Sequence, residues 1–436
     1  MKRFFLTCYL LLPTLLFAQS TWYMDLPGTD FVGECVATHD GGVVVVTFLQ
    51  NKIIKLDASG NLLWTYVIDT SGVQFLRGVT ETEDHGIVAF GSVGSFSSTH
   101  VIKLDENGNR LWEKNFNVPG QTLTAQWVCP AHGDGGFLIG GGECALQFYV
   151  ARCDSNGSIQ WVQQFFGLTT APTGFFSDMV QAPGSGYVAT YSKLDNSDLD
   201  WGILKLDDNG GFVWAKALDE GAERDEVVDA VPTLAGGVAV LGTTTNYQAP
   251  NNENKMTLTT FDGSGNRLSY RVYDYTEQLQ PRALTQVSDG GFVITGSTFS
   301  LTTLLVKTDI LGAIQWQKVG NIATTQEGYG LAMAPNDMFY LSAGDFTHKT
   351  TVAKLSALTG QGVCAEAPIQ LSTSSHQPPM LTPTGSSFAG AIVATPVNYP
   401  HYSETIQPTL VCGVLADEAP MPTATLQASP NPFSGN

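Results

Sequence analysis

The segment Lys55-Leu56-Asp57-Ala58-Ser59-Gly60-Asn61-Leu62-Leu63-Trp64 decides the fold, because its pattern returns along most of the chain. Residues 103–112 read Lys-Leu-Asp-Glu-Asn-Gly-Asn-Arg-Leu-Trp, and looser versions begin at residues 152, 205, 260, 307 and 354. The third position of the pattern falls at residues 57, 105, 154, 207, 262, 309 and 356, which are 48, 49, 53, 55, 47 and 47 residues apart. Seven copies at such a period indicate a repeat fold.

Each copy predicts four short strands. In the first copy we expect strands at 33–38, 43–48, 52–56 and 62–68, because β-branched and aromatic residues fill these runs. The Asp-x-x-Gly and Asp-Gly-Gly segments between strands suit tight turns, and we expect positive φ at Gly41, Gly136 and Gly291. A four-stranded antiparallel unit repeated radially is a propeller blade. We therefore predict an all-β, seven-bladed β-propeller over residues 19–363; a six- or eight-bladed ring and two smaller sheets remain alternatives.

The two ends of the repeat region predict how the ring closes. The seventh copy has lost both the Asp and the Trp of the pattern, whereas residues 21–26, with Trp22, resemble an isolated fourth strand. A strand from the N-terminus that completes the last blade would remove an exposed sheet edge. We therefore expect Trp22 to occupy the fourth strand of blade 7.

The N-terminus has the pattern of a secretory signal peptide, which we assign to residues 1–18. Lys2-Arg3 is followed by an apolar run over 4–17 and by the small residue Ala18. This run is too short to span a membrane, and no later stretch reaches 18 apolar residues, so we expect no transmembrane span. Asp and Glu outnumber Lys and Arg by 40 to 21, which argues against nucleic acid as a partner.

The cysteines agree with export. Outside the leader six remain, and an even number in an exported chain suggests disulfides, whose pairing the sequence leaves open. We favour Cys364–Cys412, because the two residues flank one Pro/Ser/Thr-rich segment; Cys129 with Cys144 or Cys153 is a second candidate. Residues 364–415 are predicted to be an irregular extension, closed by that disulfide.

The end of the chain differs from the rest. After a linker that begins at residue 416, Pro430-Asn431-Pro432-Phe433 resembles the opening of the type A sorting domain of proteins exported by the type IX secretion system. The match covers about ten residues and stops at Asn436, so residues 416–436 are interpreted as a linker and the truncated start of that domain. The resemblance implies the type IX secretion machinery as a partner. It also implies a location outside a bacterial cell or on its outer-membrane surface.

The repeat carries a second resemblance. Its Leu-Asp-x-x-Gly-x-x-x-Trp pattern is similar to the tryptophan-docking motif of quinoprotein propellers, in which the Trp packs between neighbouring blades. The resemblance implies that packing role for Trp64, Trp112, Trp161, Trp214 and Trp316. The spacing from Asp to Gly is one residue shorter than in that family, and the chain has no adjacent pair of cysteines. Bound pyrroloquinoline quinone (PQQ) is therefore not expected.

Strand direction separates the two faces of the predicted ring. Turns that join the first to the second strand and the third to the fourth strand of each blade lie on one face, here called the turn face. The other connections lie on the opposite face, here called the loop face, and they vary in length. Because loops held by a scaffold often carry recognition, we predict ligand binding on the loop face by Asp195, Asp198, Asp200, Trp201, Tyr247, Asn251 and Asn252.

No catalytic pattern stands out, and we predict no catalytic residue. His39 and His85 lie beside Asp40 and Asp84 in matching turns, which turn chemistry explains best. The Asp-x-x-Gly turns resemble calcium loops but lack the later bidentate Glu, so we expect no resident cofactor and keep Ca²⁺ as an alternative. The sequence therefore favours a monomeric, secreted, non-catalytic module that binds a glycan, protein or matrix ligand. The alternative is a propeller enzyme, either a quinoprotein-like dehydrogenase or a polysaccharide lyase or hydrolase.

Overall fold

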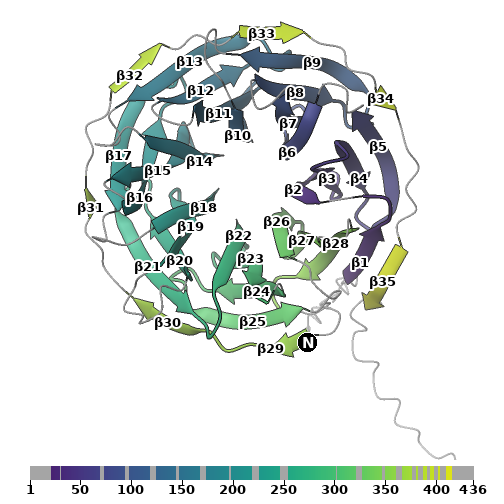
Figure 1. Ribbon diagram of the computed structural model, residues 1–436, viewed down its shortest axis with the longest axis vertical. Helices are drawn as coiled ribbons and strands as arrows, with labels where there is room; N and C mark the ends of the chain where they lie inside the picture. Colours follow the sequence, from purple (N-terminus) through teal and green to yellow (C-terminus); the bar gives the residue numbers. More distant parts are fainter. Residues whose placement is uncertain are drawn as a thin grey trace, which may run out of the picture.

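The computed structural model describes residues 21–414 with gaps at 30, 69–72, 94–97, 118–123, 144–146, 167–172, 196–197, 219–224, 246–253, 301, 321–326, 346–348, 360–365, 376–379, 382–385, 390–392, 397–400 and 403–408. Seven antiparallel sheets form a ring (Figure 1). The axial space lined by their innermost strands is here called the channel. The prediction of a seven-bladed, all-β propeller is confirmed. Within the described part of the chain, no helix is long and apolar enough to cross a membrane.

Each blade runs outward from the channel as four antiparallel strands, which are consecutive in the sequence in blades 1 to 6. The innermost strands are β2 (Val32–Ala37), β6 (Val73–Glu81), β10 (Thr124–Pro130), β14 (Thr173–Gln181), β18 (Asp225–Pro232), β22 (Leu279–Gln286) and β26 (Glu327–Ala334). The second strands are β3 (Val43–Thr47), β7 (Ile87–Val93), β11 (Phe137–Glu143), β15 (Tyr187–Asp195), β19 (Val238–Thr244), β23 (Phe292–Thr298) and β27 (Met338–Asp345).

The outer half of each blade completes the repeat. The third strands are β4 (Lys52–Leu56), β8 (Ser98–Leu104), β12 (Gln147–Cys153), β16 (Asp198–Leu206), β20 (Lys255–Phe261), β24 (Thr303–Thr308) and β28 (Lys349–Ser356). The fourth strands are β5 (Leu62–Ile68), β9 (Arg110–Asn117), β13 (Ile159–Phe166), β17 (Phe212–Leu218), β21 (Arg267–Asp274), β25 (Ile314–Gly320) and, from the N-terminus, β1 (Thr21–Leu26).

The N-terminal strand closes the ring as predicted. β1 pairs with β28 in blade 7, with Trp22 opposite Lys354. The Trp22 side chain is only 3% exposed, and its Nε1 donates a hydrogen bond of 3.1 Å to the Ala58 carbonyl in blade 1. This strand therefore joins the last blade to the first.

The C-terminal extension is not irregular, which corrects the prediction for residues 364–415. It forms seven short strands, and each adds a fifth, outermost strand to one blade (Figure 1). In blade order from 6 back through 1 to 7 they are β29 (Glu366–Pro368), β30 (Ser372–Ser375), β31 (Met380–Leu381), β32 (Ser386–Ala389), β33 (Val393–Pro396), β34 (His401–Tyr402) and β35 (Thr409–Val414). We call these seven strands the belt. It covers strand edges that would otherwise present unpaired backbone groups.

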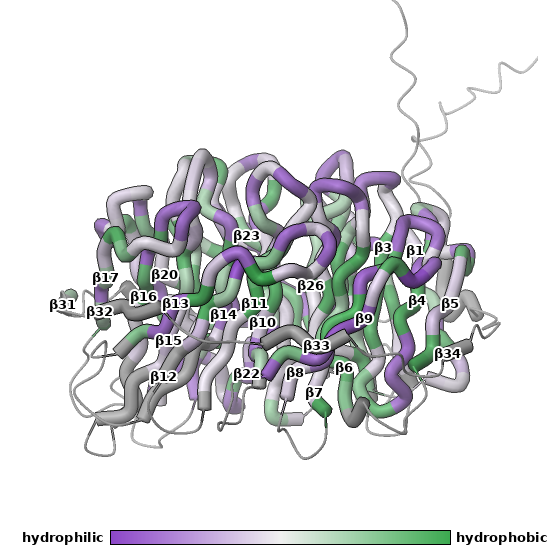
Figure 2. Tube along the Cα trace, turned by 90° about the horizontal axis from the view of Figure 1, so that it is seen from above, coloured by the Kyte–Doolittle hydropathy of each residue, from purple (hydrophilic) through white to green (hydrophobic). Residues whose placement is uncertain are grey.

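The hydrophobic core is divided among the seven junctions between blades. One cluster, for example, joins Val44 and Ile53 of blade 1 to Leu76 and Ile87 of blade 2. Six further clusters fill the other junctions. In the side view, hydrophobic residues lie along strands such as β3 and β4, and more hydrophilic residues lie at the turns (Figure 2).

The repeated Trp residues pack between blades. Trp64 Nε1 donates to the Glu106 carbonyl of the next blade at 3.0 Å, and Trp112 and Trp316 make equivalent bonds to Ser155 and Ala357. Four of the Trp rings cover a turn glycine of the next blade, where a Cβ would come within 3.0 Å of the ring: Gly108 under Trp64, Gly157 under Trp112, Gly210 under Trp161 and Gly265 under Trp214. The glycine of the repeat therefore makes room for the tryptophan of the preceding blade.

The turn glycines follow the prediction only in part. Gly41 has a φ of 82°, but in blades 3 and 6 the positive φ belongs to Gly135 and Gly290, not to Gly136 and Gly291. The second glycine is needed for a different reason. A Cβ at Gly136 would lie 2.3 Å from the Cys153 carbonyl oxygen, so the end of β12 passes too close for any side chain.

The disulfide predictions have different outcomes. The second candidate was a disulfide from Cys129 to either Cys144 or Cys153. The structure contains neither, because Cys129 and Cys153 are both free and buried. Burial raises the pKa of both thiols well above its usual value, which keeps them protonated. Cys144 and Cys364 lie outside the described residues, and the favoured Cys364–Cys412 pairing stays a prediction.

Candidate functional site

A cavity of about 470 Å³ occupies the half of the channel next to the turn face. All seven innermost strands line it with residues from the parts that run into the turns, for example Ala37 of β2 and Gln181 of β14. A cavity of this volume is within the usual range for small-molecule sites. The site therefore lies on the axis of the ring, where no single repeat shows it.

A β-bulge in every innermost strand shapes the wall of this cavity. Pairing with the second strand skips a residue at the same place in each blade. A bulge redirects a side chain and frees a backbone group from the ladder. The skipped residues are Arg77, Gln126, Ser177, Val228, Arg282, Tyr329 and, in β2, the pair Gly33 and Glu34.

Two of the three carboxylates in the cavity wall bridge neighbouring innermost strands. Asp178 Oδ2 accepts the Ala230 backbone N–H at 3.0 Å, and Asp229 Oδ2 accepts the Leu284 N–H at 2.6 Å. Glu34 Oε2 lies beside Gly78, where a Cβ would come within 2.4 Å of it. These acids therefore help to hold the ring together, and they also make the cavity wall acidic.

The three carboxylates share an environment that favours protonation. Burial, then the charge of Asp229, raises the pKa of Glu34 to about 8, although the Val79 backbone N–H opposes this. Burial and the charges of Asp229 and Glu34 raise the pKa of Asp178 well above its usual range, and burial raises that of Asp229 to about 6. Glu34 is exposed to the channel, so channel water offsets part of its shift.

An arginine and a tyrosine complete the cavity wall. The Arg282 guanidinium lies 5.5 Å from the centre of the Tyr329 ring, a cation–π distance. Ser177 and Gln181 add polar groups, and Val228 and Leu331 add apolar ones. The wall thus combines hydrogen-bond acceptors, a cation and an aromatic ring around a space large enough for a small polar molecule.

The structure describes four of the seven predicted loop-face residues, and one of the four lies in the core. Trp201 is only 2% exposed and packs edge-on against Phe261, at 6.2 Å between ring centres, so it belongs to the core between blades 4 and 5. This corrects its assignment to a ligand-binding loop. Asp195 and Asp198 are opposite each other in the backbone pairing at the end of the β15–β16 hairpin, and Asp200 follows in β16. Tyr247, Asn251 and Asn252 lie outside the described residues.

The cavity residues were missed because the sequence was read for variable loops. A signal was present: Glu34, Asp178 and Asp229 are acidic residues within innermost strands, a few residues before the turn. Aligning the seven copies on this strand would have placed the three acids, and Arg282, at neighbouring positions of one ring.

No protein-family model matches the chain, and no curated protein does. Solved structures do resemble it. A catalytically inactive variant of virginiamycin B lyase from Staphylococcus aureus, with quinupristin, matches with a TM-score of 0.56 and 11% identity over 77% of this chain and 99% of that chain. Drosophila Plexin A in complex with Semaphorin 1b gives a TM-score of 0.46 and 9% identity over 78% of this chain and 87% of that chain. At 11% identity, the likeness to the lyase structure shows the β-propeller fold alone.

Proposed function

We propose that this chain is a secreted, non-catalytic binding module that holds a sugar unit of a glycan in the turn-face half of its channel. The observation that carries the proposal is the cavity of about 470 Å³, whose wall contains three carboxylates, Arg282 and Tyr329. Sugar hydroxyls can donate hydrogen bonds to ionised carboxyl groups and accept them from protonated ones. An aromatic ring offers an apolar surface to the C–H face of a sugar.

The state of the carboxylates favours binding over catalysis. A general acid or base needs its proton-transfer atom directed at the substrate. Asp178 and Asp229 each accept two backbone N–H groups, including one from the next blade, so their oxygens are committed to the scaffold. A lyase or hydrolase is the second candidate, because raised carboxyl pKa values are also a feature of catalytic sites.

A glycan array probed with the full chain tests the proposal, followed by calorimetry with the best glycan. Arg282→Ala and Tyr329→Leu should each weaken binding by about tenfold or more, equivalent to about 1.4 kcal/mol, without a matching loss of thermal stability. The matched control replaces Asp195, Asp198 and Asp200 with Ser on the loop face and should bind like the parent. The channel proposal fails if the control loses binding while both channel variants keep it.

A cleavage assay tests the alternative that the chain is an enzyme. The best glycan is incubated with the chain and the products are analysed by mass spectrometry. Recovery of intact glycan supports the binding module. Cleavage that Asp229→Asn abolishes would favour the lyase or hydrolase instead.

We also propose export through the type IX route. The leader over residues 1–18 and Pro430-Asn431-Pro432-Phe433 support this proposal from the sequence, and both lie outside the described residues. In a bacterium with this secretion system, the 436-residue chain should stop in the periplasm, and a complete sorting domain fused after Asn436 should carry it to the surface. Surface display of the unfused chain would contradict the proposal.

A further inference from the structure

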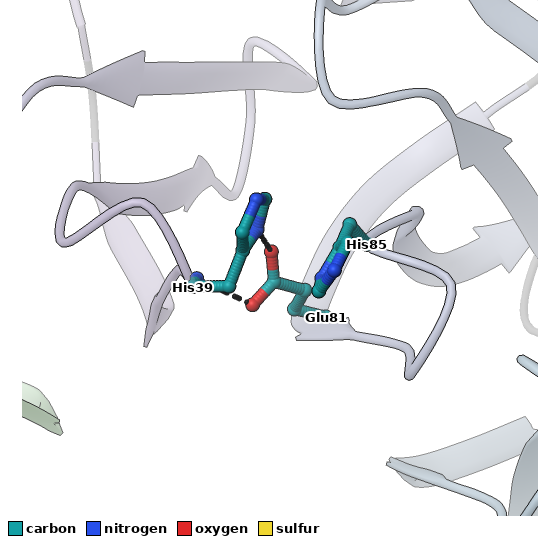
Figure 3. A group of neighbouring side chains, drawn as sticks. All are labelled: His39, Glu81 and His85. Atoms are coloured by element: carbon teal, nitrogen blue, oxygen red, sulfur yellow. Dashed lines mark hydrogen bonds and ion pairs between the residues drawn. The ribbon is translucent and has the colours of Figure 1, made fainter.

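Three side chains from two neighbouring blades meet on the turn face, away from the channel carboxylates. His39 lies in the turn between β2 and β3 of blade 1, His85 in the matching turn of blade 2, and Glu81 at the end of β6 (Figure 3). One ligand atom of each side chain lies within 4.8 Å of the others. Within the described residues, no other group of three His, Cys, Asp or Glu side chains meets this condition.

The contacts orient His39 toward Glu81. Glu81 Oε1 lies 2.8 Å from His39 Nδ1, and Glu81 Oε2 accepts the His39 backbone N–H at 2.8 Å. On the other side of the ring, His39 Nε2 lies 3.8 Å from Glu106 Oε2. A histidine with a carboxylate behind its second nitrogen is a common arrangement at metal centres, because the carboxylate fixes the ring.

The conformation of His85 adds a second observation. Its backbone has a φ of 62°, at the turn position where Gly41 and Gly290 adopt positive φ in blades 1 and 6. Side chains other than glycine are uncommon there. His85 nevertheless occupies the position and stacks its ring on His39 at 3.6 Å between ring centres. Turn chemistry alone, the interpretation from sequence, explains the glycines but not this pair of histidines.

We propose that His39, Glu81 and His85 bind a divalent transition-metal ion of the zinc class and so connect blades 1 and 2 at the turn face. Two imidazoles and one carboxylate form a donor set that suits zinc and leave a coordination position open. Ca²⁺ and Mg²⁺ prefer oxygen ligands alone. In this arrangement His39 binds through Nδ1, which faces Glu81, and its Nε2–H faces Glu106. The His85 ring, stacked on His39 with 22° between the ring planes, turns so that one of its nitrogens points at the same ion.

The test is calorimetric titration of the metal-free full chain with Zn²⁺, and in parallel with Ca²⁺ and Mg²⁺. One Zn²⁺ per chain should bind, and His85→Gly and His39→Ala should weaken that binding at least tenfold. His85→Gly is informative because glycine suits the backbone of this position and so should not cost stability. His132→Ala is the matched control, since His132 lies in the equivalent turn of blade 3 and contacts Gln181, not a carboxylate.

Thermal denaturation gives an independent readout. Zn²⁺ should raise the melting temperature of the parent and of His132→Ala but not that of His85→Gly, because a ligand of the native state alone stabilises it. The proposal is overturned if the parent binds no Zn²⁺, if His85→Gly and His39→Ala bind it like the parent, or if Ca²⁺ binds with equal affinity.

Discussion

Lys55, Lys103 and Lys307 begin the repeated Lys-x-Asp segments, yet each of these lysines is buried. Each pairs with an aspartate of the first turn of its own blade: Lys55 with Asp40, Lys103 with Asp84 and Lys307 with Asp289. The N–O distances are 2.6, 2.6 and 2.9 Å. The sequence identified the turn aspartates but not their partners. A signal for these lysine partners was available in the sequence. A lysine recurs at the same position of an otherwise apolar strand in several copies of the repeat.

The pair in blade 1 predicts an asymmetry between its two partners. Asp40→Asn leaves the Lys55 ammonium, whose side chain is 2% exposed, without its anion. Lys55→Met leaves a carboxylate that water can still reach, since Asp40 is 39% exposed. We therefore expect Asp40→Asn to cost roughly 1–3 kcal/mol, and more than Lys55→Met. Urea unfolding at pH 7 measures both, and an equal or reversed order would contradict the asymmetry.

The same pair predicts a dependence on pH. Burial alone would raise the pKa of Asp40, but hydrogen bonds from Lys55, Thr38 and the Gly42 N–H outweigh it and lower the pKa from 3.8 to about 2. A lowered folded-state pKa stabilises the protein above the unfolded value, and this contribution is lost as the pH falls through the folded value. The stability difference between the parent and Asp40→Asn should therefore shrink between about pH 4 and pH 2. A difference that stays constant over this range would exclude the linkage.

Strands of the repeat could be predicted from sequence, whereas the belt strands could not. A strand such as 52–56 is defined by its own apolar residues and by turns at fixed spacing. The belt strands β31 and β34 have two residues each, in a segment rich in Ser, Thr and Pro. Their structure depends on the exposed edges of the fourth strands, which belong to residues far away in the sequence. From the sequence, pairing with an exposed strand edge was predicted only for the N-terminal strand.

The closing strand β1 leads to a prediction about elements. β1 lies between β28 and β35, so deleting residues 21–26 removes the attachment of the last belt strand as well as the fourth strand of blade 7. Loss of a buried Trp alone typically costs about 3–5 kcal/mol, so the melting temperature should fall sharply. Deleting residues 416–436 instead is the control and should leave the melting temperature unchanged. A deletion of 21–26 that melts like the parent would mean that the ring does not need β1.

At the scale of the whole molecule, the predicted Cys364–Cys412 disulfide would join the two ends of the belt. The belt begins with β29 on blade 6, two residues after Cys364, and ends with β35, which contains Cys412, on the neighbouring blade 7. A disulfide between these cysteines would close a covalent loop around the propeller, which would restrict the unfolded chain and stabilise the fold.

Peptide mapping under non-reducing conditions tests this closure. The chain folded under oxidising conditions should yield one cross-linked pair of peptides that contain Cys364 and Cys412, and Cys412→Ser should melt at a lower temperature than the parent. Cys153→Ser is a control for the mapping, because Cys153 is a free, buried thiol. Recovery of both peptides alkylated, without a cross-link, would show that the belt is held by strand pairing alone.

The proposed site is also a property of the whole molecule, which is why the sequence did not predict it. Asp178, Asp229 and Arg282 come from three different blades, and only ring closure brings them around one cavity. Sequence reasoning placed recognition on the loop face because it compared loop lengths, a local feature. The bulges that shape the channel depend instead on pairing between strands.

A crystal structure of the full chain with the best-binding glycan tests the central proposal most directly. The account predicts electron density for an uncleaved sugar unit in the turn-face half of the channel, within hydrogen-bond distance of the Glu34 carboxyl group and in contact with Arg282 or Tyr329. Density on the loop face near Asp195 and Asp198, with only water in the channel, would contradict it.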